Sequence, residues 1–124
     1  MTETLQSSSA RDMTAEAPLT PERLCSLGLS DTPPDALAYC LRHGLRQYLL
    51  LAIDLMHQCI SRVEACHLRL EQDLDTGEEW LVLEVTLQED VEEVLTSCDA
   101  YTDRWIAQVP WPERDQIRLV YNMI

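Results

Sequence analysis

The sequence contains no lysine, and all 9 of its basic residues are arginine. The chain therefore has no P-loop lysine, no Schiff-base nucleophile and no lysine general base. Phenylalanine is absent as well, so three tryptophans and four tyrosines supply the aromatic side chains. None of the G-x-S-x-G, H-E-x-x-H or G-x-G-x-x-G motifs of common enzyme families occurs. These absences argue against catalysis and favour a protein without enzymatic activity.

Long hydrophobic runs are missing too. The longest uninterrupted run extends from Leu49 to Ile53, far short of the roughly 20 residues that a membrane-spanning helix needs. The N-terminus lacks a basic segment followed by an apolar one, which is the pattern of a secretory signal. We therefore expect a cytoplasmic protein that makes no contact with a membrane.

The 5 cysteines are widely spaced and include no C-x-x-C pair. A secreted disulfide scaffold would have an even, denser set, so we expect reduced thiols. His57, Cys59, Cys66 and His67 are residue types that bind zinc. Their spacing is wrong for a shared site, because residues two apart on a helix and adjacent residues on a strand point in different directions. The sequence predicts no metal and no cofactor.

Negative charge dominates the composition, with 22 acidic residues and a formal net charge of −13. Residues 64–103 hold thirteen of these acidic residues, and Arg69 is the one basic residue among them. Such a surface repels phosphate backbones, so we expect no nucleic-acid partner. It attracts and steers a basic protein. The alternative is that the charge only keeps a small protein soluble.

The pattern along the chain predicts a disordered acidic tail over residues 1–18 and a single α+β domain over residues 19–124. Apolar residues recur at helical spacing over about 26 residues after Thr32, a candidate N-cap, and predict one long helix. Gly44 lies inside this stretch and weakens it, so a bend or break there stays open. A short helical turn capped by Thr20 precedes it.

After Ser61 the apolar period changes to two, which is typical of strands. A turn from Leu74 to Gly77 joins two such strands, and the register that matches apolar residues places Leu68 opposite Leu83. The parity changes near Ala65, which indicates a bulge.

A second helix follows, capped by Asp90. Its predicted inner stripe consists of Val91, Val94, Leu95, Cys98, Trp105, Ile106 and Val109. A third strand ends the chain. We predict a two-layer α+β sandwich in the order long helix, β-hairpin, helix, β-strand. Its three-stranded antiparallel sheet has the strand order 2-1-3, with the helices on one face.

The open face of this sheet is the first candidate site. Tryptophan and arginine are typical anchors of protein interfaces, and this face offers the docking residues Trp80, Val82, Val120, Arg69 and Arg118 to a second copy or to another protein. A homodimer through the open face is one such arrangement. A second interpretation is a small-molecule-binding or catalytic site built from His67, Arg69, Glu84 and Arg118. A third is an ordinary half-solvated face with cross-strand pairs.

The outer face of the second helix is the other candidate. Glu92, Glu93, Asp99 and Asp103 recur at helical spacing, and no basic residue follows the first two at a distance of four. Their repulsion is not relieved within the helix, which favours an external basic partner over a merely solvated face.

The run from Leu70 to Val85, with the segments Val91–Glu93 and Tyr101–Trp105 after it, resembles a group of small uncharacterised bacterial proteins. The resemblance implies a bacterial cytosolic setting and carries no activity. The sequence therefore favours a non-enzymatic protein-interaction or regulatory module. One form would be an antitoxin-like inhibitor of a basic partner.

Overall fold

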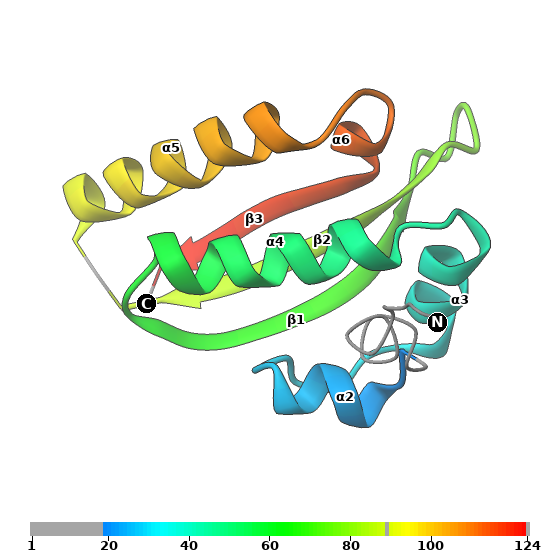
Figure 1. The fold of residues 1–124 in the computed structure, drawn as a ribbon, viewed down its shortest axis with the longest axis horizontal. Helices are drawn as coiled ribbons and strands as arrows, with labels where there is room; N and C mark the ends of the chain where they lie inside the picture. Colours follow the sequence, from blue (N-terminus) through cyan, green and yellow to red (C-terminus); the bar gives the residue numbers. More distant parts are fainter. Residues whose placement is uncertain (1–18, 89, 124) are drawn as a thin grey trace, which may run out of the picture.

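A computed structural model describes residues 19–88 and 90–123; the predicted disordered tail lies outside this range. The described helices and strands follow one another in the order α2 (Pro21–Ser26), α3 (Pro34–Arg42), α4 (Arg46–Cys59), β1 (Val63–Gln72), β2 (Glu79–Leu87), α5 (Val91–Gln108), α6 (Glu113–Gln116) and β3 (Ile117–Met123). Figure 1 shows α4 and α5 packed along one three-stranded sheet, with α2 and α3 at its β1 side. The predicted α+β class is correct.

The predicted long helix is divided into α3 and α4 at Gly44, where the sequence leaves a bend or break open. Gly44 adopts a φ of 66°, in the left-handed region where a glycine has no Cβ to clash. The Leu45 N–H then donates to the Cys40 carbonyl at 2.9 Å, as in a glycine-terminated helix end. The cap predicted at Thr32 is wrong, since Pro33 occupies the N-cap position without a side-chain hydrogen bond.

The β1–β2 hairpin has the predicted register. Leu68 lies opposite Leu83, and the register shifts between Val63 and Ala65, where the bulge was expected. The turn is closed by the Asp73 N–H, which donates to the Glu78 carbonyl at 2.8 Å. Apolar alternation on both strands fixes this pairing, because a shift by one residue would turn every core side chain outward.

The predicted strand order is wrong. The sheet is ordered β1-β2-β3, and β3 runs parallel to β2 instead of antiparallel to β1. The segment from Leu81 to Leu83 explains why β2 is central. Val82 between them is only 2% exposed although it points away from the helices, and strands that are apolar on both faces occupy central positions.

The core lies between the sheet and the two long helices. Leu68 and Leu83 are fully buried in it together with Leu49 and Met56 of α4. The Asp90 side chain accepts from the Glu93 N–H at 2.9 Å and starts α5 as predicted. Among the described residues, no helix combines the length and the apolar character that spanning a bilayer requires.

Candidate functional site

Glu84 is the centre of a polar cluster on the open sheet face. His67 Nε2 and Arg69 Nε each lie 3.0 Å from Glu84 Oε1, and Asn122 Nδ2 donates to Glu84 Oε2. The hydrogen bonds from Arg69 and Asn122 hold the pKa of the Glu84 carboxyl below its ordinary value of 4.5. The cluster therefore ties the three strands together. A carboxylate with a lowered pKa and three neighbours is poorly suited to act as a general base.

The apolar residues of the open face are largely covered by the face's own side chains. The Arg118 guanidinium carbon lies 4.3 Å from the centre of the Trp80 ring, a cation–π contact. Val82 lies in register between Arg69 and Arg118, whose aliphatic stems can cover it while their charged ends stay in water. Val120, at the edge of the sheet, is 37% exposed. Docking through this face stays a prediction.

The acidic stripe lies where the sequence placed it. Glu92, Glu93, Asp99 and Asp103 are all exposed on α5. Glu92 and Glu93 occupy its first turn, where the helix dipole favours carboxylates. Asp99 and Asp103 are one turn apart, so their like charges repel each other. Binding of a partner to these residues is likewise a prediction.

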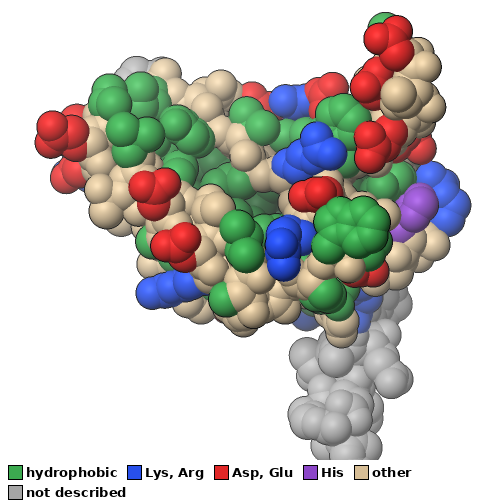
Figure 2. Space-filling model, turned by 90° about the horizontal axis from the view of Figure 1, so that it is seen from above, with side chains coloured by type: hydrophobic (Ala, Val, Ile, Leu, Met, Phe, Trp, Pro, Cys, Tyr) green, Lys and Arg blue, Asp and Glu red, His purple; other side chains and the backbone are tan. Residues whose placement is uncertain are grey.

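A surface that the sequence did not indicate lies beside this stripe. Nine large hydrophobic side chains of the described residues are exposed, and five belong to α5 or to the helix-facing side of β3: Val91, Leu95, Ile106, Tyr121 and Met123. We call the surface formed by these five residues the α5–β3 edge. Figure 2 looks down on this side and shows hydrophobic side chains gathered around a hollow.

The hollow is a groove of about 280 Å³ between α5 and β3. Cys98 and Ile106 line it from the helix, and Leu119 and Tyr121 line it from the strand. Trp105 also lines it and donates from its indole nitrogen to the Arg114 carbonyl at 3.1 Å. The groove between α5 and β3 is thus lined mainly by apolar side chains, with Arg114, Asp115 and Arg118 among its other lining residues.

The sequence pattern assigned Val91, Leu95 and Ile106 to the buried stripe of α5, but these side chains are 47–56% exposed. Only Val94, Tyr101 and Trp105 of α5 are buried. The sequence did contain a signal for this exposure. The apolar stripe of α5 is wide, and a stripe this wide is fully buried only if other elements pack on both sides of the helix. Within the described residues α4 supplies one neighbour, and the other side opens on the groove.

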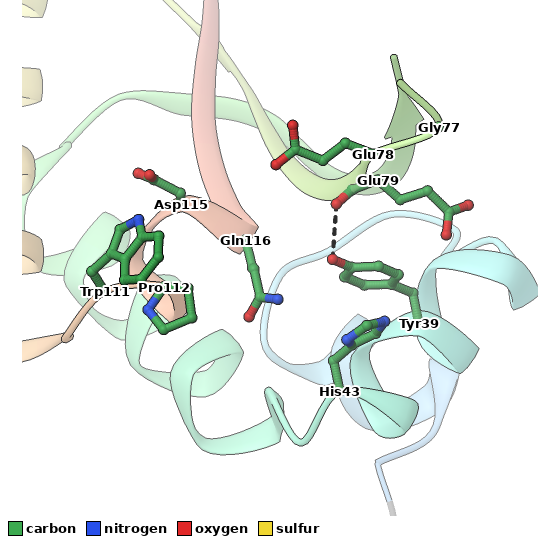
Figure 3. Close-up of a pocket in the computed structure, with 9 residues that line it drawn as sticks. All are labelled: Tyr39, His43, Gly77, Glu78, Glu79, Trp111, Pro112, Asp115 and Gln116. Carbon is green, nitrogen blue, oxygen red and sulfur yellow. Dashed lines mark hydrogen bonds between the residues drawn. The ribbon is translucent and has the colours of Figure 1, made fainter. Parts of the chain in front are cut away.

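A second hollow, of about 380 Å³, lies where β2 and β3 begin. In Figure 3, Trp111 and Pro112 stand on one side of it and Tyr39 and His43 on the other. The Tyr39 hydroxyl donates to the Glu79 carbonyl at 2.9 Å, and the Tyr39 and His43 rings are 4.2 Å apart. The hydrogen bond therefore links the Tyr39 side chain to the first residue of β2.

The chemistry of this hollow suits a positively charged side chain. Glu78 and Asp115 line it, and the Trp111 side chain beside them is exposed. Carboxylates attract an arginine or lysine, and an indole face adds a cation–π contact. Asp115 also lines the groove between α5 and β3, so the two hollows adjoin.

The residues considered as zinc ligands do not form a common site. Cys66 is fully buried in the core, where burial raises the pKa of its thiol to about 12. His67 points to the opposite face and contacts Glu84. In the part of the chain that the structure describes, no group of three or more His, Cys, Asp or Glu side chains could hold a metal ion.

Comparison of the chain with protein-family models, with curated proteins and with solved structures finds no match. The function is therefore inferred from the fold and from the chemistry of its surfaces.

Proposed function

We propose that this chain is a non-catalytic protein-interaction module that binds a basic partner protein through the α5–β3 edge. The observation that carries the proposal is that five of the nine exposed large hydrophobic side chains of the described residues lie on this edge. Single exposed hydrophobic residues are normal on soluble proteins, whereas a contiguous group typically marks a docking surface.

The charge distribution favours a basic partner. The chain carries a net charge of −13, and the acidic stripe of α5 runs beside the apolar residues of the edge. Electrostatic attraction would speed the approach of a basic protein, and apolar contacts at the edge would hold it. An antitoxin-like inhibitor of a basic protein is one form of such a module, because its acidic surface would cover the charge of the protein that it neutralises.

Two variants at neighbouring positions of α5 test the proposal. Leu95→Glu places a charge on the α5–β3 edge, whereas Thr96→Glu adds the same charge beside it, on the acidic stripe. Leu95 and Thr96 are both exposed, so each variant should change the stability by less than about 0.5 kcal/mol. Wild type and both variants are immobilised and used to capture proteins from host-cell extract. Each captured protein is then purified, and its affinity for wild type and for each variant is measured.

We expect a basic protein that binds wild type and Thr96→Glu with similar affinity, and Leu95→Glu about tenfold or more weakly. Raising the salt concentration should weaken all three interactions by slowing association. Capture of the same proteins by wild type and Leu95→Glu, with equal affinities after purification, would show that the α5–β3 edge is not the docking surface. A strongly acidic partner would contradict the electrostatic part of the proposal.

A further inference from the structure

We infer that the partner docks by adding a β-strand to the free edge of β3, beneath α5, and that this strand has alternating apolar residues in its middle and basic residues at both ends. The inference rests on the proposed function and specifies how the α5–β3 edge is used.

The two edges of the sheet differ. At the β1 edge, the Ser30 N–H donates to the Cys66 carbonyl at 2.7 Å, and Leu29 is buried there. Within the described residues β3 pairs only with β2. Alternate residues of an edge strand direct their N–H and C=O groups outward, ready to pair with another strand. β3 also lacks two sequence features that protect many edge strands, since it contains no proline and only one charged residue, Arg118.

A helix, α5, runs along the position next to β3 that an added strand would occupy. Figure 1 shows α5 on the far side of β3 from β2. The 18 residues of α5 span about 27 Å, and the 7 residues of β3 span about 23 Å, so the helix is long enough to run beside the whole strand. Two helices side by side are about 20 Å wide and three strands only about 14 Å. The difference is roughly the width of one strand.

The groove determines which residues the added strand needs. Leu119 and Tyr121 line the groove from β3, and Cys98 and Ile106 line it from α5. Side chains alternate between the two faces of a strand, so every second residue of the partner would enter this apolar groove. Main-chain hydrogen bonds to β3 would supply affinity, and the groove would select apolar side chains at those positions.

Carboxylates stand at both ends of this edge. β3 ends where α5 begins (Figure 1), and the first turn of α5 carries Glu92 and Glu93. At the other end Asp115 lies two residues before Ile117, the first residue of β3, and Asp115 shares the second hollow with Glu78 and Trp111. Arg114 and Arg118 also line the groove at this end, but Arg114 Nε donates to the Val109 carbonyl and the Arg118 guanidinium lies over the Trp80 ring. The carboxylates at both ends therefore suit arginine or lysine in the added strand. A second copy of the chain fits less well, because two such edges would bring their acidic ends together and each copy carries −13.

Synthetic peptides test this mode of docking on the full-length chain. The probe is Arg-Arg-Val-Thr-Val-Thr-Val-Thr-Arg-Arg, and a first control replaces its four arginines by glutamate. Two further peptides carry N-methyl groups on the three valines or on the three threonines. Because the valine and threonine N–H groups point to opposite edges of a strand, only one of these peptides loses the hydrogen bonds to β3. Affinities come from titration calorimetry, and exchange rates of the β3 amides come from NMR.

We expect the arginine peptide to bind and the glutamate peptide to bind at least about tenfold more weakly. One N-methylated peptide should lose about tenfold or more in affinity while the other stays close to the parent. The parent peptide should also slow exchange of alternate β3 amides.

Equal affinities of the two N-methylated peptides, or no binding of the parent peptide, would overturn strand addition. The proposed function would then still be decided by the Leu95→Glu and Thr96→Glu comparison. Sedimentation equilibrium of the chain alone tests whether a second copy occupies this edge. A dimer whose β3 amides are protected from exchange would show that it does, and would overturn the proposal of a basic partner strand.

Discussion

Replacing Leu83 by alanine tests the observed sheet order against the order that the sequence suggested. Leu83 is fully buried on the central strand, in register between Leu68 and Leu119. Leu119 is on the edge strand and only partly buried. In a sheet of order 2-1-3, by contrast, Leu83 and Leu119 would both lie on edge strands, and truncating either should have a similar effect.

The expected free-energy changes differ by more than the error of the measurement. Truncation of a fully enclosed leucine to alanine costs about 3–5 kcal/mol, because the transfer free energy is lost and a cavity remains. For the half-buried Leu119, less apolar area leaves water and solvent can fill the gap, so Leu119→Ala should cost about 1–2 kcal/mol. At roughly 3–5 °C per kcal/mol for a domain of this size, the Leu83→Ala variant should melt about 10–20 °C below wild type.

Urea denaturation followed by circular dichroism measures both variants, with stability compared at a common m value. Leu83→Met is the matched control, because it keeps the side-chain volume and should cost less than about 1.5 kcal/mol. If Leu119→Ala destabilises the protein as much as Leu83→Ala does, β2 is not the central strand and the description of the β3 edge fails with it.

Three further outcomes follow from individual contacts. Glu84→Gln should lower the free energy of unfolding at pH 7 by on the order of 1–2 kcal/mol. The pKa of Glu84 is lowered in the folded state, so its contribution to the free energy of unfolding is present above the carboxyl's ordinary pKa of 4.5. This contribution is lost as the pH falls through the lower folded value. A stability difference between wild type and variant that grows on acidification would contradict this. Gly28→Ala should cost about 1–2 kcal/mol in thermal unfolding, because φ is 105° and a Cβ would lie 3.1 Å from His57 Nε2. In thiol labelling at pH 7.5, exposed Cys25 should react in the native state, whereas buried Cys66, with its thiol pKa raised to about 12, should react only after unfolding; equal labelling rates would show that the core is open.

Part of the candidate site followed from local pattern alone. Alternation on β1 and β2 set the register, and the register brought His67 opposite Glu84 and Arg69 opposite Val82. The same rule could not show that Asn122 completes the cluster, since that contact depends on which strand lies beside β2.

What the sequence by itself determined is therefore the short-range structure: the hairpin, its bulge, the Asp90 cap and the two sides of each strand. These features depend on neighbours close along the chain, where side-chain periodicity and capping chemistry act directly. The tertiary structure alone decided the place of β3 and the exposure of Leu95 and Ile106. Each of these depends on how an apolar surface is shared among elements distant in sequence, and several packings bury similar area until the strands and helices meet.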